Sequence, residues 1–178
     1  AAALVHRGRV GPQFVKSLLP TYDVFDEDRY FEPGSGLAAL DLGRIRAAVS
    51  VCEDVWNDRD FWQRPRYLSD PIDEMGRLGA SVLLNLSASP FSVGKQRVRE
   101  AMLGALAREH AAHVVYVNQV GGNDDLIFDG RSVVIACTPA AIICRATAGS
   151  LTVQTYKPSF SANTRSANAW SMKSHADR

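Results

Sequence analysis

The stretch that decides the fold is Val49-Ser-Val-Cys-Glu-Asp-Val-Trp56. Residues 47–51 are apolar and rich in β-branched side chains, which predicts a short buried strand. The strand ends at Cys52, where the sequence changes abruptly to the acidic pair Glu53-Asp54. In an open α/β sheet, ligands bind in the turns beyond the carboxyl ends of the strands. Cys52 is therefore a candidate nucleophile, although most free cysteines are small buried residues without a chemical role.

Strands and helices alternate around this stretch. Residues 81–86 form a continuous apolar run, which predicts a fully buried strand, and residues 114–120 predict the next one. Between them, residues 95–112 show one apolar stripe at helical spacing. A shorter helix is predicted between Asp70, a typical N-cap residue, and Gly79, a typical terminator. This order indicates the α/β class. Further strands are predicted at residues 1–5, 10–15, 37–45 (at a sheet edge) and 131–137.

Composition and charge exclude several classes of protein. The 178 residues suffice for one domain or part of one, and the formal net charge of +1 gives no electrostatic case for binding nucleic acid or an anionic membrane. No apolar run approaches the ~18 residues of a membrane span, and no signal peptide opens the chain. The cysteines are Cys52, Cys137 and Cys144. Their odd number and spacing disfavour a disulfide framework or a zinc site and favour a reducing cytoplasm.

Four motifs in a fixed order carry a resemblance to a known family. They are Lys16-Ser-Leu-Leu-Pro-Thr-Tyr-Asp-Val-Phe-Asp-Glu-Asp-Arg-Tyr-Phe31, Cys52-Glu-Asp-Val-Trp56, Asn85-Leu-Ser-Ala-Ser-Pro-Phe91 and Tyr116-Val-Asn-Gln-Val-Gly-Gly-Asn-Asp-Asp125. Together they resemble the nitrilase (carbon–nitrogen hydrolase) superfamily and, within it, the glutaminase domain of glutamine-dependent NAD synthetases. The resemblance covers residues 1–135. It implies a nitrilase-like α-β-β-α sandwich, truncated here at the N-terminus.

The resemblance implies amide hydrolysis by a thiol. Cys52 would be the nucleophile that forms a thioester, and Lys16 would stabilise the oxyanion and lower the pKa of the thiol. No metal is implied. The residues implied to bind the substrate are Tyr22, Glu53, Trp56 and Ser89.

Each of these residues also has a plainer interpretation when it is taken alone. A lysine is usually solvated, an aromatic side chain in a loop usually packs, and serines commonly satisfy the backbone of turns. Asn118 and Gln119 end a predicted strand, and we expect them to orient the site.

The general base is missing from the expected place. The resemblance implies a catalytic glutamate well before the lysine motif, but residues 1–15 contain no Glu or Asp. We therefore expect weak binding and little turnover. Glu27, Asp28 and Glu32 follow Lys16 in a loop, and the sequence gives no physical ground for assigning any of them to the site.

The composition of the sequence changes after residue 136. From residue 137 to the end, Asp177 is the only acidic residue, and the amphipathic pattern is lost. We expect residues 1–136 to form a partial carbon–nitrogen hydrolase domain. Residues 137–178 are expected to be a divergent, poorly ordered tail, the product of a shifted reading frame or a degraded fragment.

The leading hypothesis is a glutaminase that supplies ammonia for NAD synthesis. Its expected partners are glutamine, a synthetase domain elsewhere and a second copy packed through the sandwich. ATP and deamido-NAD would bind that separate domain, so no cofactor is expected on this chain. The alternatives are a stand-alone nitrilase-type amidase acting on another small amide, and a non-catalytic remnant.

Three other patterns have plainer interpretations. The segment Ser92-Val-Gly-Lys95 lacks the first glycine and the final Ser/Thr of a phosphate loop. His110 and His113 lack two further ligands for a metal. The basic start of the helix at residues 95–112, which includes Arg99, is predicted to be a solvated face.

Overall fold

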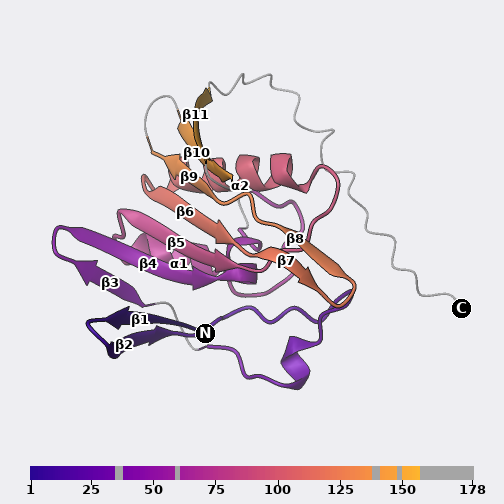
Figure 1. Ribbon diagram of the computed structural model, residues 1–178. Helices are drawn as coiled ribbons and strands as arrows, with labels where there is room; N and C mark the ends of the chain where they lie inside the picture. Colours follow the sequence, from indigo (N-terminus) through magenta and orange to yellow (C-terminus); the bar gives the residue numbers. More distant parts are fainter. Residues whose placement is uncertain (35–37, 59–60, 138–140, 148–149, 157–178) are drawn as a thin grey trace, which may run out of the picture.

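The computed structural model describes residues 1–34, 38–58 and 61–137 with their side chains, and residues 141–147 and 150–156 as backbone. These ranges form a mixed α/β fold with one large sheet in the order β11-β10-β9-β6-β5-β4-β3 (Figure 1). The strands are β1 (Ala2–His6), β2 (Arg9–Phe14), β3 (Ala39–Leu42), β4 (Ile45–Val51), β5 (Val82–Ser87), β6 (His113–Asn118), β7 (Val120–Asn123), β8 (Leu126–Asp129), β9 (Val133–Ala136), β10 (Ala141–Thr147) and β11 (Ser150–Tyr156). The α-helices are α1 (Pro71–Arg77) and α2 (Lys95–Glu109), and the 3-10 helices are η1 (Glu27–Arg29) and η2 (Cys52–Val55).

Three parallel strands form the centre of the large sheet. β4 pairs with β5 and β5 with β6 in parallel, while the other described neighbours in this sheet are antiparallel. The register sets Val51 beside Leu86 and Ser87 beside Asn118. The carboxyl ends of β4, β5 and β6 therefore meet at one edge of the sheet, where the segment beginning at Cys52 follows β4.

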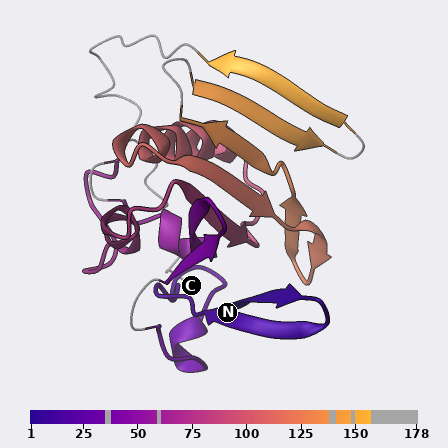
Figure 2. The ribbon, with the colours of Figure 1, turned by 90° about the vertical axis from the view of Figure 1, so that its left-hand side faces the viewer.

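Both α-helices cover the same face of this sheet (Figure 2). Alternate residues of the central strands, such as Ala48 and Leu83, pack against Met102 and Leu103 of α2. The opposite face is exposed at Leu86 (44%) and Val117 (50%), whereas Ala47 and Val49 of β4 are buried on the same face. The expectation that residues 81–86 are fully buried is therefore wrong for this face. No helix within the described residues is long and apolar enough to cross a membrane.

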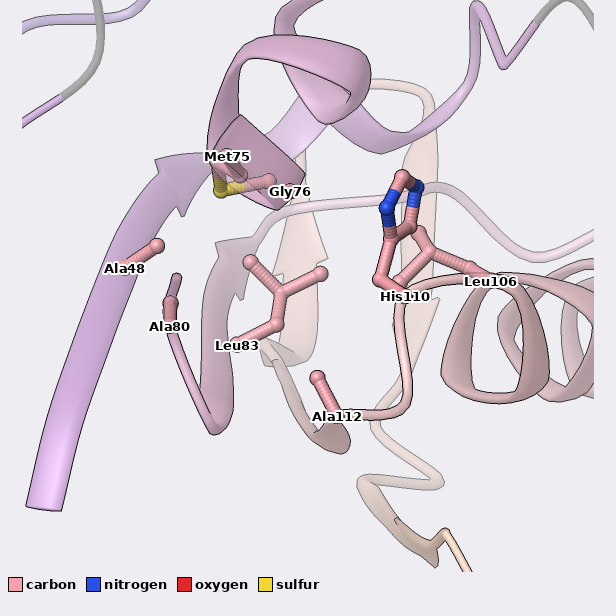
Figure 3. A pocket seen from close by; sticks show the side chains of 8 residues that line it. All are labelled: Ala48, Met75, Gly76, Ala80, Leu83, Leu106, His110 and Ala112. Carbon is pink, nitrogen blue, oxygen red and sulfur yellow. The ribbon is translucent and has the colours of Figure 1, made fainter. Parts of the chain in front are cut away.

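The short helix α1 begins and ends where the sequence predicts. The Asp70 carboxylate accepts the N–H groups of Ile72 and Asp73 at 3.1 and 3.4 Å, and Gly79 follows the helix with a φ of +65°. Gly76 faces the His110 imidazole, and a Cβ there would lie 2.4 Å from Nδ1 (Figure 3). The small apolar cavity beside this contact, about 10 Å³, lies near the amino ends of β5 and β6 rather than near Cys52.

The edges of the sheet differ in detail from the sequence prediction. The edge strand predicted at residues 37–45 is β3, and it ends at a turn in which Gly43 has a φ of +65°. β1 and β2 form their own hairpin despite Pro12 in β2, and β7 and β8 form another. At the other edge, β10 and β11 extend the sheet beyond β9. Residues 138–140, 148–149 and 157–178 of the predicted tail lie outside the described residues.

Replacing Leu103 by Ala tests the contact between α2 and the sheet. Leu103 is 0% exposed, so Leu103→Ala should lower the free energy of unfolding by ~2–5 kcal/mol through lost burial and a cavity. Leu68 is 94% exposed, so Leu68→Ala is the matched control and should change it by less than ~0.5 kcal/mol. Urea unfolding followed by circular dichroism measures both. Equal effects of the two variants would contradict the described core.

Candidate active site

Cys52 lies where β4 passes into the 3-10 helix η2. Its φ of +48° is in the left-handed region, which a residue with a Cβ adopts only at some cost. The Asp54 carboxylate holds this turn, since its Oδ2 accepts the Val51 N–H at 2.9 Å. The turn thus fixes the cysteine at the carboxyl end of the central strands. The position agrees with the sequence prediction.

Asp54 also joins this turn to the segment after Lys16. Its Oδ1 accepts the N–H groups of Ser17 and Leu18 at 3.0 and 2.9 Å. The side chain is fully buried, and burial raises its pKa while the three N–H donors act in the opposite direction. One carboxylate therefore brings the lysine and cysteine motifs together. The sequence analysis did not anticipate this role.

Lys16 forms a buried ion pair with Glu27. The ammonium Nζ lies 2.7 and 2.6 Å from the two carboxylate oxygens, and the lysine is 9% exposed. The plainer interpretation of Lys16 as a solvated residue is therefore wrong. Glu27, for which the sequence gave no ground, belongs to the candidate site. Because an ammonium has three N–H donors, one donor remains for another acceptor.

Burial dominates the electrostatics of the Cys52 thiol. Desolvation raises its pKa, and the Lys16 charge is the largest of the effects that lower it. The Ala88 N–H and the Ser87 side chain hydrogen bond to the sulfur and also lower the pKa, whereas Glu53 raises it. The net pKa is above the ordinary value, so the thiol is neutral near pH 7. An attack by this sulfur therefore needs a base.

Glu53 is a buried carboxylate between two phenols. The Tyr22 hydroxyl donates to Oε1 at 2.7 Å, and the Tyr67 hydroxyl donates to the same oxygen at 3.3 Å. Burial and the Glu53 charge raise the pKa of both tyrosines, so both stay neutral donors. The Arg66 guanidinium lies 3.6 Å from the centre of the Tyr22 ring. The arrangement is a fixed negative charge next to Cys52.

Asn57 folds the loop that carries Tyr67 and Arg66. Its Oδ1 accepts the N–H groups of Arg66 and Tyr67 at 2.8 and 3.0 Å. Its Nδ2 donates to the carbonyls of Tyr67 and Ser69 at 3.0 and 2.7 Å. Both ends of the amide are thus satisfied by the backbone of residues 66–69. A loop without regular structure, as predicted, is nevertheless held in one shape.

Trp56 and Lys95 lie together on another side of the site. The Trp56 ring stacks on Trp62 at a centroid distance of 6.3 Å, and Lys95 Nζ lies 5.2 Å from the centre of the Trp56 ring. Lys95 Nζ also donates to the Pro90 carbonyl at 3.2 Å, and no described carboxylate forms an ion pair with it. Burial lowers the pKa of Lys95. The sequence analysis assigned Lys95 no role at the site.

The prediction of a solvated basic face at the start of α2 holds for Arg97, which is exposed, but is wrong for Arg99. Arg99 is 1% exposed, with its guanidinium 5.0 Å from the centre of the Tyr116 ring. Its Nη1 donates to the Gly130 carbonyl at 3.5 Å, and its Nη2 lies 4.0 Å from an Asp129 oxygen. The apolar stripe of α2 does not include this position. Elements distant in sequence enclose it instead.

The Ser89 backbone is held by Asn118. The Ser89 N–H donates to Asn118 Oδ1 at 2.8 Å, and Asn118 Nδ2 donates to the Gly130 carbonyl at 2.9 Å and the Ser89 carbonyl at 3.3 Å. The expectation that Asn118 orients this region agrees with these bonds. The Gln119 side chain is exposed, and the backbone carbonyl of Gln119 accepts the Gly130 N–H at 2.9 Å.

The described residues contain no group of three or more side chains suited to hold a metal ion. His113, one of the two histidines considered above, accepts the Cys137 N–H through Nδ1 at 3.1 Å.

Comparison with known proteins places this arrangement in a family. The glutamine-dependent NAD(+) synthetase of Synechocystis is 45% identical over 132 residues, which are 74% of this chain and 24% of that protein. The structure of the Acinetobacter baumannii enzyme of the same name matches with a TM-score of 0.71 and 33% identity, covering 88% of this chain and 28% of that one. A nitrilase-superfamily amidase from Nesterenkonia shares the fold, with a TM-score of 0.60, 23% identity and coverage of 83% and 51%. No family model matches the chain.

The fold matches that of nitrilase-superfamily amidases. By sequence, the chain belongs to the nitrilase-like glutaminase region of glutamine-dependent NAD synthetases. It spans about a quarter of the length of the curated relatives that it matches.

The charge of Lys16 can be tested by its effect on the thiol. Lys16→Met removes the largest effect that lowers the pKa of Cys52, so this pKa should rise. The rate of alkylation by iodoacetamide, measured from pH 6 to 10, should fall about tenfold or more at each pH below the pKa. Arg44→Met removes an exposed cation at the far end of β4 and should leave the profile unchanged. An unchanged profile in Lys16→Met would show that the two groups do not interact.

Proposed function

We propose that this chain hydrolyses the side-chain amide of glutamine and supplies ammonia for NAD synthesis. The observation that carries the proposal is the buried Lys16 cation acting on a cysteine thiol at the carboxyl end of β4. The membership of the glutaminase region supports the same assignment. A thiol beside a fixed cation suits attack on a carboxamide, because negative charge develops on the carbonyl oxygen.

The proposed chemistry has two steps. The Cys52 thiol gives its proton to a carboxylate base of the kind that the family resemblance implies, and this base later returns the proton to the nitrogen. The sulfur bonds to the carbonyl carbon, and the free donor of Lys16 stabilises the oxyanion. The C–N bond then breaks, the nitrogen takes up a proton and leaves as ammonia, and a thioester remains. Water hydrolyses the thioester to glutamate and restores the thiol. Glu27 holds the Lys16 ammonium group in place during both steps.

The charged groups around Cys52 match the ends of glutamine. Glu53 offers a fixed anion for the α-ammonium group, and Lys95 offers a cation without an ion pair for the α-carboxylate. Tyr22 holds Glu53 in place, and Trp56 forms an apolar wall beside Lys95. Ser89, in the loop after β5, would help to bind the substrate. An amide without these charges would lose both contacts, which favours glutamine over a simple small amide.

The proposal extends to the partners of the chain. Ammonia released here would be used by a synthetase domain that binds ATP and deamido-NAD, so the chain itself would need no cofactor. A second copy could associate through the open apolar face of the sheet, where Leu86 and Val117 are exposed.

A glutamine-like electrophile tests the assignment of the nucleophile. Diazo-oxo-norleucine should add one equivalent to Cys52, as located by peptide mass spectrometry. Cys52→Ser should abolish the addition, whereas Cys137→Ser, which changes the other described free thiol, should not. An excess of glutamine should protect. Labelling at Cys137 alone, or no labelling of the folded protein, would contradict the proposal, and equal labelling by a chloroacetamide would favour a small-amide amidase.

Substitution of Lys95 tests the recognition of the substrate carboxylate. Lys95→Met keeps much of the apolar stem but removes the charge, so labelling by diazo-oxo-norleucine should slow by about 10-fold to 100-fold. The loss is expressed relative to iodoacetamide, which carries no carboxylate and corrects for any change in the Cys52 thiol. Arg97→Met changes an exposed cation two residues further along α2 and is the matched control. Equal slowing with both reagents would exclude a role in carboxylate binding.

A further inference from the structure

Three polar side chains form a buried hydrogen-bonded chain that leads to Cys52. Asn85 Nδ2 donates to Ser50 Oγ at 2.9 Å, and Ser87 Oγ donates to Asn85 Oδ1 at 2.7 Å. Ser50 and Asn85 are paired in register on β4 and β5, and both are 1% exposed or less. Val51 is paired with Leu86, so Cys52 and Ser87, which follow them, are neighbours at the ends of β4 and β5, and hydrogen bonding by the Ser87 side chain lowers the pKa of the thiol. The thiol therefore lies at the end of a connected chain of polar groups.

A buried amide in this position needs an explanation. Taking Asn85 out of water costs free energy that its hydrogen bonds only offset, whereas an aliphatic residue would fill the same space without that cost. Ala48 and Leu83, which precede Ser50 and Asn85 by two residues on the same face, are apolar. The polar residues begin only where the strands approach Cys52.

The direction of the hydrogen bonds must depend on the state of the sulfur. Ser87 has one proton, which it gives to Asn85 Oδ1 in the structure, and its oxygen can then only accept, from the protonated thiol or from the Tyr116 hydroxyl. A thiolate is an acceptor, so Ser87 must turn its proton toward the sulfur. Asn85 keeps both partners if its amide turns over, because Nδ2 then donates to Ser87 while Oδ1 accepts the Ser50 hydroxyl proton.

We propose that Ser87 and Asn85 are positioning residues that stabilise the Cys52 thiolate by reversing this hydrogen-bonded chain. No proton enters or leaves the chain, since each hydroxyl keeps its own proton and only the donor directions change. The thiol proton goes to hydroxide or buffer in the alkylation assay and to the carboxylate base in the proposed reaction. The inference deepens the proposed function, because it explains how a buried sulfur can become the attacking anion.

Other groups around the sulfur also affect the pKa of Cys52, and the Ser87 and Asn85 variants leave them unchanged. Lys16 lies on the segment after β2, Glu53 on η2 and Lys95 on α2, while Tyr116 on β6 remains a neutral phenol because burial raises its pKa. The Ala88 N–H donates to the sulfur from the loop after β5. None of these groups can change its donor direction as Ser87 and Asn85 can, apart from the Tyr116 hydroxyl.

The first test measures the ionisation of Cys52 in Ser87 variants. Ser87→Ala removes the donor, so the rate of alkylation by iodoacetamide should fall about tenfold at each pH below the pKa, and the pKa should rise. Ser87→Thr keeps the hydroxyl and should restore most of the rate. Ser81→Ala, at the opposite end of β5, should leave the profile unchanged. A wild-type profile in Ser87→Ala, with the fold intact by circular dichroism, would overturn the proposal.

The second test follows the Asn85 amide itself. Its side-chain ¹H and ¹⁵N resonances, assigned with Asn85→Leu, should shift with the same midpoint as the alkylation of Cys52. In Ser87→Ala this shift should disappear, because the sulfur and the amide are no longer connected. A shift that persists in Ser87→Ala reports only the field of the thiolate and contradicts the reversal.

Neither test requires glutamine. Failure of the glutaminase assignment would appear as absent labelling by diazo-oxo-norleucine with these profiles intact. Failure of the positioning role would appear as unchanged profiles in a chain that still reacts with that reagent.

Discussion

The candidate site depends on one buried carboxylate, that of Asp54. It accepts N–H groups from both sides, one at the end of β4 and two on the segment that follows Lys16. A buried carboxylate is costly unless donors surround it, and these three donors would themselves be costly if they were left unpaired. The two segments are therefore stable together only in this arrangement. The nearness of Lys16 to Cys52 follows from that constraint.

The charges at the site oppose each other in a way that keeps the resting thiol neutral. Lys16 favours the thiolate, but Glu27 already takes up two of its donors, and Glu53 adds negative charge next to the sulfur. Burial then outweighs the cation, and the pKa of Cys52 rises. A neutral thiol reacts slowly with electrophiles until a base removes its proton. Because burial and charge oppose each other in this way, single hydrogen bonds to the sulfur also affect the pKa of Cys52.

The sequence predicted the elements but not the contacts made across loops. Apolar periodicity located β4, β5 and β6 and placed Cys52 at a strand end, because periodicity reports local packing. Glu27 lies eleven residues after Lys16, at the start of η1, and only the folded path brings the two together. Arg99 lies outside the apolar stripe of α2, yet Tyr116 and Gly130 enclose it from β6 and the β8–β9 turn. Such burial leaves no local pattern in the sequence.

The apolar residues that stabilise the sheet and the polar residues near Cys52 lie at different positions along the same strands. On the face covered by the helices, the early positions Ala48, Leu83 and Val114 are apolar and pack against α1 and α2. Two residues later the same face carries Ser50, Asn85 and Tyr116, all buried. The apolar half holds the strands in register, and this register aligns the polar half beneath Cys52. A buried polar chain is tolerated there because the apolar packing beside it stabilises the strands. That packing offsets the free energy that burying the polar groups costs.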